Sequence, residues 1–141
     1  MKVKTVAADS ESKAPVMILT DADEQVMLPI WIGRFEADAI TGVLEKKETM
    51  RPMTYDLFRA ALVASGARVV KATIVELKET TYYARLVISQ DGKETELDAR
   101  PSDSIAMALR FDAPIFAAEA VLRAAAIADR GKAVDGTVTL T

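Results

Sequence analysis

Two residue types common in enzyme sites, cysteine and histidine, are absent from this chain of 141 residues. The absence of cysteine excludes a disulfide framework and thiolate metal sites. The absence of histidine excludes Ser-His-Asp and Cys-His nucleophilic catalysis, imidazole general bases and histidine-bound zinc. Any catalysis therefore depends on carboxylates, Lys, Arg, Tyr, hydroxyl groups or a metal ion bound by oxygen ligands. Such an ion would be Mg²⁺ or Mn²⁺, which prefer hard oxygen donors.

Long apolar runs and an excess of basic charge are missing as well. No uninterrupted apolar run is longer than Ala60–Ala64, whereas a membrane-spanning helix needs about 20 residues. Lys2 and Lys4 are not followed by an apolar stretch, so we expect no signal peptide, no membrane span and a cytoplasmic protein. The 18 basic and 21 acidic residues give a net charge of −3, without the strongly basic surface of many nucleic-acid-binding domains. The scattered arginines still allow a local basic groove.

Half of the residues are hydrophobic, which at this length is enough for one domain with a buried core. Alternating apolar residues and the turns between them predict three strands and then a helix in each half of the chain. In the first half we expect strands at Val3–Ala7, Pro15–Leu19 and Val26–Ile32 and a helix over Phe35–Lys47. In the second half we expect strands at Val69–Leu77, Tyr82–Ser89 and Glu94–Ala99 and a helix from Ser102 to about Arg110.

Capping and turn residues mark the ends of several elements. Thr54 is the predicted N-cap of a helix that joins the two halves and ends at Gly66. Asp91-Gly92 predicts a tight hairpin between two strands. Beyond the short apolar segment Ile115-Phe116, an alanine-rich helix is predicted over 117–130, followed by a tail with a turn at Asp135-Gly136.

The two halves fall in register when the second is shifted back by 67 residues, which places Ile30 on Leu97 and Glu36 on Asp103. Few residues are identical, so chance matching within an α+β chain is the alternative to duplication. We predict an α+β fold with a duplicated β-β-β-α unit, forming one mainly antiparallel sheet or two small sheets that meet, with helices packed against them. The predicted domain is 1–130, with units at about 2–47 and 69–111, a linking helix at 54–66 and a tail at 131–141.

Several segments together resemble the bifunctional nuclease family, a group with assigned DNase and RNase activity. They are Leu28-Pro29-Ile30-Trp31-Ile32-Gly33 with Glu36-Ala37, Arg51-Pro52-Met53-Thr54-Tyr55-Asp56-Leu57, Tyr83-Ala84-Arg85-Leu86, Asp98-Ala99-Arg100-Pro101-Ser102-Asp103-Ser104-Ile105-Ala106 and Ala113-Pro114-Ile115-Phe116. The resemblance covers roughly residues 3–122. It implies two β-rich units with helices on one side, and a nuclease that acts on DNA or RNA. Arg34, Arg51 and Arg85 are candidate nucleic-acid-binding residues.

One position departs from the family pattern. The family usually has histidine where this chain has Tyr55, within Thr54-Tyr55-Asp56-Leu57. Tyrosine donates a hydrogen bond but is a poor base near neutral pH, because its reference pKa is about 10. This departure and the acidic charge balance favour the alternative to a nuclease, which is a non-catalytic module that binds an anionic ligand or a partner protein.

Asp98, Arg100 and Asp103 are the leading candidates for a phosphodiester site. The carboxylates would hold Mg²⁺ or Mn²⁺, and Arg100 would pair with phosphate oxygens. Strand alternation places Asp98 and Arg100 on one face, with Asp103 in the first turn of the following helix. The structural alternative is equally concrete: Ser102 caps the helix, and Arg100 forms an ion pair with Asp98 or Asp103.

Two further carboxylates complete the candidate catalytic set. Glu36, the counterpart of Asp103, would add a second metal-binding carboxylate if the two halves face each other. Asp56 is the other candidate. For both residues the alternative is compensation of a helix dipole. Trp31 and Tyr83 are either packing residues or stacking surfaces for a base.

A homo-oligomer is also expected. The apolar content of the chain, the exposed strand edges of two small units and the alanine-rich last helix support this expectation. A purely structural subunit is a third alternative for the role of the protein.

Overall fold

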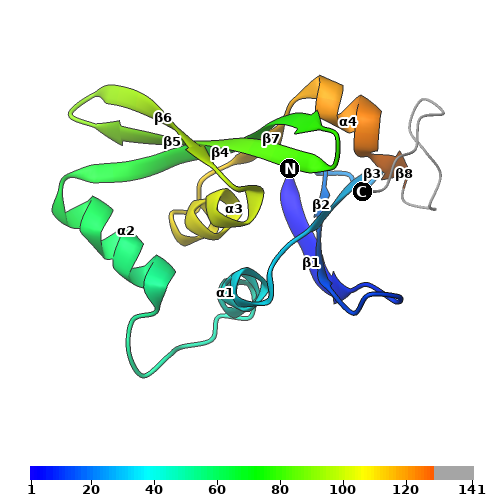
Figure 1. Cartoon of the computed structure of the whole chain (residues 1–141). Coiled ribbons are helices and arrows are strands. Elements are labelled where there is room, and N and C mark those ends of the chain that lie inside the picture. Colours follow the sequence, from blue (N-terminus) through cyan, green and yellow to red (C-terminus); the bar gives the residue numbers. More distant parts are fainter. Residues whose placement is uncertain (129–141) are drawn as a thin grey trace.

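The computed structural model describes residues 1–128. Figure 1 shows the order of the elements along the chain. They are β1 (Lys2–Ala8), β2 (Pro15–Thr20), β3 (Val26–Trp31), α1 (Arg34–Leu44), α2 (Thr54–Ala64), β4 (Ala67–Lys78), β5 (Thr81–Gln90), β6 (Lys93–Ala99), α3 (Pro101–Arg110), β7 (Ile115–Ala117), α4 (Glu119–Ala125) and β8 (Ile127–Ala128). The α+β fold predicted from the sequence is confirmed.

The strands form two sheets rather than one. The first has the order β1-β2-β3-β8 and is antiparallel throughout. The second has the order β6-β5-β4-β7, in which only the β4–β7 pair is parallel. The Tyr82 hydroxyl donates a hydrogen bond of 3.2 Å to the Pro29 carbonyl and so connects β5 of the second sheet to β3 of the first.

The third strand and the helix of each half repeat at the same separation. β3 begins at residue 26 and β6 at residue 93, and α1 begins at residue 34 and α3 at residue 101, so each pair is 67 residues apart. The additional strands break this symmetry, because β8 joins β3 whereas β7 joins β4. Duplication as the origin of the repeat, and the domain boundary at residue 130, stay predictions.

The structure first corrects the side-chain alternation expected for β1. Strict alternation put Val3, Thr5 and Ala7 on one face, but the pairing with β2 shifts register between Val3 and Thr5. This irregularity turns Val6 toward the same side as Val3, and both pack against the core while Thr5 and Ala7 are exposed.

The start of α3 is the second correction. Ser102 was expected as the N-cap, but Arg100 is the N-cap, Pro101 is the first helical residue and Ser102 is buried as the second. The fixed φ of proline suits the first helical position. Likewise Met53, not Thr54, caps α2, and its backbone N–H donates a 3.0 Å hydrogen bond to the Asp56 carboxylate.

The other helix ends differ in length. The first helix was expected to reach Lys47 but ends at Leu44, because Lys46 adopts a left-handed φ of 54°. The alanine-rich helix was expected to reach residue 130, but α4 ends at Ala125 and the chain then pairs with β3. Ile115 and Phe116, expected only as a short apolar segment, belong to β7. The tail 131–141, with its predicted turn, lies outside the described residues.

Two turns agree with the expected chemistry. Gly66 has a φ of +80° just beyond α2, as a left-handed helix end requires. Asp91 and Gly92 both have positive φ, 52° and 78°, which is the signature of the tight hairpin turn predicted there.

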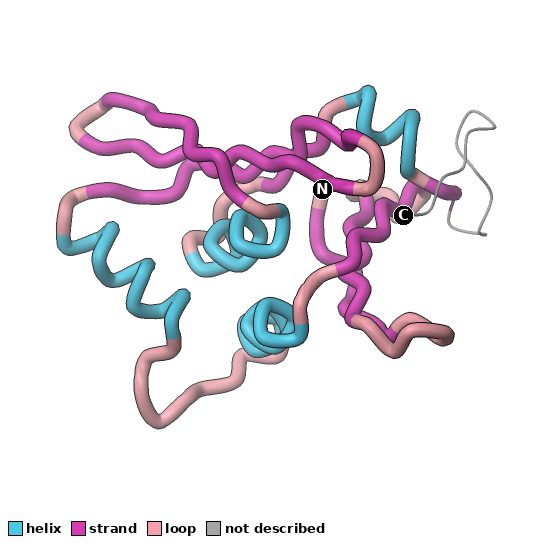
Figure 2. Tube along the Cα trace, in the orientation of Figure 1, coloured by secondary structure: helices cyan, strands magenta, loops and turns pink. Residues whose placement is uncertain are grey.

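Helices α1 and α3 lie side by side below the second sheet, whereas α2 lies at the edge of the molecule (Figure 2). The core joins Met17 and Leu28 of the first sheet, Ile74 and Leu86 of the second and Met107 of α3, all of them buried. Helix α2 contributes no buried residue. Within residues 1–128, none of the helices is long and apolar enough to cross a bilayer.

Candidate functional site

The guanidinium of Arg100 lies between two carboxylates from different units. Its Nη1 is 2.8 Å from Glu36 Oε1, while Nε and Nη2 donate to Asp103 Oδ2 at 2.9 Å and Oδ1 at 3.1 Å. Glu36 is the third residue of α1 and Asp103 the third of α3, so the two acids have the same position in their helices. The pairing with Asp103 raises the pKa of Arg100 above its usual range, and the guanidinium is charged at every relevant pH.

Gly33 makes room for Glu36 at the start of α1. A Cβ atom on Gly33 would lie 2.6 Å from Glu36 Oε2, which is closer than nonbonded atoms approach. The Glu36 side chain is only 14% exposed, while that of Arg100 is 64% exposed. The acid is therefore enclosed by the fold, and the arginine reaches it from the surface.

Tyr55 of α2 completes the cluster. Its hydroxyl donates a 2.5 Å hydrogen bond to Asp103 Oδ1. Burial, followed by this hydrogen bond and the charge of Asp103, raises the pKa of Tyr55 well above its ordinary value of 10.0. Tyr55 is therefore a neutral hydrogen-bond donor at physiological pH and not a base. We define the acid–arginine cluster as Glu36, Tyr55, Arg100 and Asp103.

Asp56 belongs to a neighbouring contact that fastens α2 to α3. Its Oδ1 lies 3.1 Å from Nε of Arg110, and the Arg110 guanidinium lies 5.3 Å from the centre of the Tyr55 ring. The backbone N–H of Met53, and then Arg110, lower the pKa of Asp56. Asp56 thus closes the first turn of its helix and supports Tyr55 indirectly.

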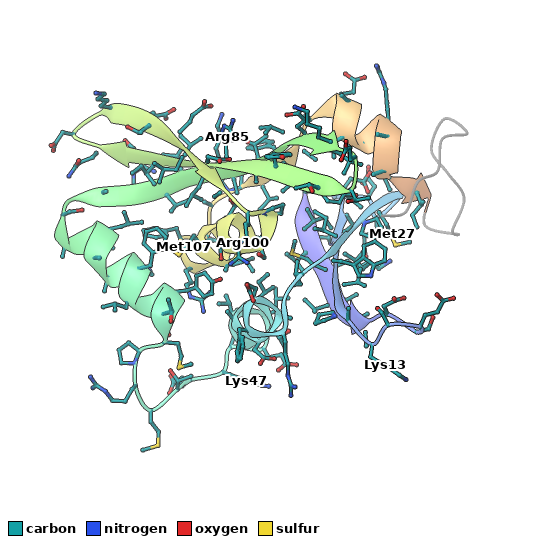
Figure 3. All side chains as sticks on the ribbon, in the orientation of Figure 1. Lys13, Met27, Lys47, Arg85, Arg100 and Met107 are labelled. Atoms are coloured by element: carbon teal, nitrogen blue, oxygen red, sulfur yellow. The ribbon has the colours of Figure 1, made fainter. Side chains whose placement is uncertain are left out.

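Asp98 lies apart from the acid–arginine cluster. Its Oδ1 is 2.7 Å from Nη1 of Arg85, its direct cross-strand partner. Figure 3 shows Arg85 on the side of the second sheet facing away from α3 and Arg100 on the side of α3. The expectation that Asp98 and Arg100 share a strand face is wrong, because β6 ends at Ala99 and Arg100 begins the helix.

The other candidate arginines occupy separate places. Arg34 is exposed at the first position of α1, and Arg51 is exposed in the loop before α2. The structure therefore brings together Glu36, Arg100 and Asp103 from the predicted set. It adds Tyr55, whose contact with Asp103 spans 48 residues of sequence and has no local signal apart from the departure from the family pattern.

A pocket of about 380 Å³ lies beside the acid–arginine cluster. The end of β3, the turn before β5 and the start of α3 form its wall, and Arg100 is part of that wall. The lining residues are Ile30, Trp31, Ile32, Gly33, Thr80, Thr81, Tyr82, Arg100, Pro101 and Ser102. The pocket combines apolar walls with a few polar groups, as ligand sites usually do.

Comparison with known proteins assigns the chain to a family. The bifunctional nuclease domain matches residues 17–130, which is most of the sequence. The chain belongs to the bifunctional nuclease domain family. An uncharacterized protein of Mycobacterium tuberculosis is 39% identical over 127 residues, covering 90% of this chain and 76% of that protein.

Relatives that carry the name bifunctional nuclease are more distant. Bifunctional nuclease 1 of Oryza sativa subsp. japonica is 27% identical over 110 residues, covering 76% of this chain and 33% of the rice protein. The bifunctional nuclease of Oryza minuta matches over the same length with the same identity. The shared domain is thus about a third of each rice protein.

In this member of the bifunctional nuclease domain family, the carboxylates of the acid–arginine cluster already have partners within the chain. Both oxygens of Asp103 accept hydrogen bonds, from Arg100 and from Tyr55. Within residues 1–128, no group of three acidic side chains is placed to hold a metal ion. Glu36 and Asp103 are the two carboxylates that converge, and they converge on a guanidinium.

Proposed function

We propose that this protein is a nuclease that hydrolyses phosphodiester bonds of DNA or RNA. The observation that carries the proposal is the match of residues 17–130 to the bifunctional nuclease domain. The relatives named bifunctional nuclease in rice support it at 27% identity. The cytoplasm is the expected compartment, to be tested by fractionation.

The proposed centre is the acid–arginine cluster beside the pocket. Arg100 has five N–H donors, and the pairs with Glu36 and Asp103 use three of them. The remaining two can donate to phosphate oxygens while the carboxylates keep the side chain in place. Positive charge at this point would stabilise the charge that develops on phosphorus-bound oxygens during hydrolysis.

A divalent metal ion is a further part of the proposal. Glu36 and Asp103 have the hard oxygen donors that Mg²⁺ and Mn²⁺ prefer, and two carboxylates are the usual number for Mg²⁺. In this second arrangement the carboxylates would no longer hold Arg100: its side chain, which is 64% exposed, would turn from them toward the phosphate, and they would hold the ion instead. When bound, such an ion lowers the pKa of a coordinated water and neutralises phosphate charge.

One observation favours a second candidate, a non-catalytic module that binds an anionic ligand. Asp103 accepts hydrogen bonds at both oxygens, and Tyr55 keeps its proton. While these contacts hold, neither group can take a proton from water. A module of this kind would bind nucleotides and leave them intact.

A cleavage assay distinguishes the two candidates. Labelled single-stranded DNA, duplex DNA and RNA are incubated with the protein in Mg²⁺, Mn²⁺ or EDTA. We expect cleavage in the presence of metal, and a loss of at least about 100-fold in Asp103→Asn. Asp98→Asn is the matched control, because it removes the same charge on the other face of the sheet, and it should keep full activity.

The opposite outcomes are equally clear. Absence of cleavage of all three substrates with either metal would overturn the nuclease proposal. Thermal stabilisation by nucleotides in that same preparation would support the binding module. Equal activity of Asp103→Asn and the unchanged protein would show that hydrolysis occurs elsewhere in the molecule.

A further inference from the structure

The pocket beside Arg100 contains a serine hydroxyl that has no hydrogen-bond partner among the described residues. Ser102 is only 5% exposed and lines the pocket. Among the described residues 1–128, its hydroxyl has no hydrogen-bond partner. The Ser102 oxygen is not among the fully buried side-chain atoms that lack a partner, so it can be reached from the pocket. The Ser102 hydroxyl is therefore a donor and acceptor available to a ligand.

Backbone donors at the start of α3 lie next to this hydroxyl. The first hydrogen bond of the helix runs from the Ser104 N–H to the Arg100 carbonyl. The N–H groups of Ser102 and Asp103 precede it, and such groups at a helix start commonly bind anions. Arg100 contributes its two remaining N–H donors to the same pocket.

The charges around the pocket are close to balance. Glu36 and Asp103 bring two negative charges and Arg100 one positive charge. The N-termini of α1 and α3 each add about half a positive charge. A phosphate with direct donors is therefore not excluded by repulsion, and a neutral base and sugar add no charge to the pocket.

The part of the wall formed by β3 is apolar and aromatic, whereas Thr80 and Thr81 add hydroxyl groups on the side of β5. Ile30 and Ile32 line the pocket, and Trp31 lines it with 37% of its surface exposed. The volume of about 380 Å³ is at the small end of the range for ligand pockets, which begins at about 300 Å³. It has room for one nucleotide-sized group and not for a base pair.

We infer that this pocket binds one unpaired nucleotide, with its phosphate at Ser102 and Arg100 and its base against the wall formed by β3. The choice of a nucleotide rests on the proposed nuclease function. A base that enters a pocket must leave its stack and its pair, so single strands are bound more readily than duplexes. The substrate class of the proposed nuclease is therefore single-stranded DNA or RNA.

The experiment measures binding without turnover. Trp31 is the only tryptophan of the chain, so its fluorescence reports directly on the pocket. The protein is titrated in EDTA with a single-stranded oligonucleotide and with the duplex of the same sequence. We expect quenching of Trp31 by the single strand, with an affinity at least about 10-fold higher than for the duplex.

Three variants, one of them a control, test the position of the site. Thr81→Phe adds bulk at the rim of the pocket, and Thr95→Phe adds the same group at an exposed position of β6 outside the pocket. We expect Thr81→Phe to weaken single-strand binding at least about 10-fold and Thr95→Phe to leave it unchanged. Ser102→Ala, which only removes the hydroxyl, should weaken binding up to about 10-fold.

The outcomes separate this inference from the proposed function. Equal affinity for single strand and duplex overturns the inference, and so does binding that neither Ser102→Ala nor Thr81→Phe weakens. Cleavage is measured separately with Mn²⁺. If the protein binds single strands in the pocket but cleaves no substrate, the nuclease proposal is overturned and the pocket is still assigned as a site for one unpaired nucleotide.

Discussion

At the scale of residues, a single arginine pairs with two acids that have matching positions in α1 and α3. Glu36 and Asp103 occupy the third position of their helices, and both contact Arg100. The first unit has Gly33 at the position that corresponds to Arg100. The missing side chain of Gly33 leaves space for the Glu36 carboxylate, so the guanidinium of the second unit can reach it. Glycine at position 33 and arginine at position 100 together allow one side chain to pair with both acids.

Tyr55 should contribute to stability through its hydroxyl. Tyr55→Phe removes the donor to the charged Asp103 carboxylate, and a hydrogen bond to a charged group contributes about 1.5–3 kcal/mol. We expect a loss near the lower end of that range in urea unfolding, because Asp103 keeps its contacts with Arg100. Tyr83→Phe, at an exposed tyrosine of β5, is the control and should change the free energy of unfolding by less than about 0.5 kcal/mol.

The raised pKa of Tyr55 predicts an alkaline effect on stability. In the unfolded chain Tyr55 loses its proton near pH 10, whereas the folded protein retains it to higher pH. The contribution is therefore complete below pH 10 and falls as the pH rises through the folded pKa. Unfolding measured from pH 8 to 11 should show a steeper loss in the unchanged protein than in Tyr55→Phe. Identical slopes would contradict the prediction.

At the scale of elements, the starts of three helices carry the site. Glu36, Asp56 and Asp103 are each the third residue of their helix, where a carboxylate favours the helix dipole. The same residues have different partners, because Asp56 pairs with Arg110 while the other two pair with Arg100. Helix capping and site formation are therefore not alternatives in this fold, since one carboxylate does both.

Gly33→Ala should disturb the start of α1 through Glu36. The backbone of Gly33 is extended, with a φ of −76°, so alanine fits it, but the new Cβ would displace the Glu36 carboxylate. We expect a coupling energy of about 0.5–1 kcal/mol between Gly33→Ala and Glu36→Gln in a double-mutant cycle of unfolding free energies. Strict additivity of the two changes would show that the displacement does not matter.

Gly42→Ala is the matched control within the same helix. Apart from its chain neighbours and the backbone of its own helix, no described atom lies within 4 Å of a Cβ at Gly42. Replacing glycine inside a helix with alanine stabilises by roughly 0.5–1 kcal/mol. Gly33 before α1 and Gly42 within it should therefore respond differently to the same substitution, in line with the different space around them.

At the scale of the whole molecule, α2 differs from the other described helices, because each of them has buried residues and α2 has none. It has no buried residue, and a helix of 11 residues is marginal in water without packing. Its contacts with the rest of the chain include the pairs made by Tyr55 and Asp56. Leu57 is 65% exposed, and the preceding Met50 is fully exposed. The apolar exposure of this region is what a second copy of the chain would cover.

The homo-oligomer expected from the sequence can be tested on this helix. We expect light scattering to give about twice the monomer mass of 15.3 kDa. Leu57→Glu should return the protein to the monomer, since a charge at an apolar interface is costly. Thr95→Glu, at an exposed position of β6, should leave the mass unchanged. A monomer in the unchanged protein would refute the expectation.

Much of the architecture could be predicted because it depends on local patterns. The strands at 82–89 and 94–99 follow from alternation, and the turn between them from Asp91-Gly92, which only needs its two positive φ values. The errors arose where a pattern has two solutions. Ser102 is a residue type that often precedes a helix, but Pro101 suits the first helical position. The helix therefore begins at Pro101, and Arg100 is its N-cap.

The sequence by itself determined the α+β class, the turns at Gly66 and Asp91-Gly92 and the chemistry that the absence of cysteine and histidine excludes. Only the tertiary structure decided which candidates meet. It joined Glu36, Tyr55, Arg100 and Asp103 and left Asp98 with Arg85 on the other face. The physical reason is the separation along the sequence. Turns and strand faces depend on residues that are neighbours in the chain, whereas these contacts depend on how α1, α2 and α3 pack.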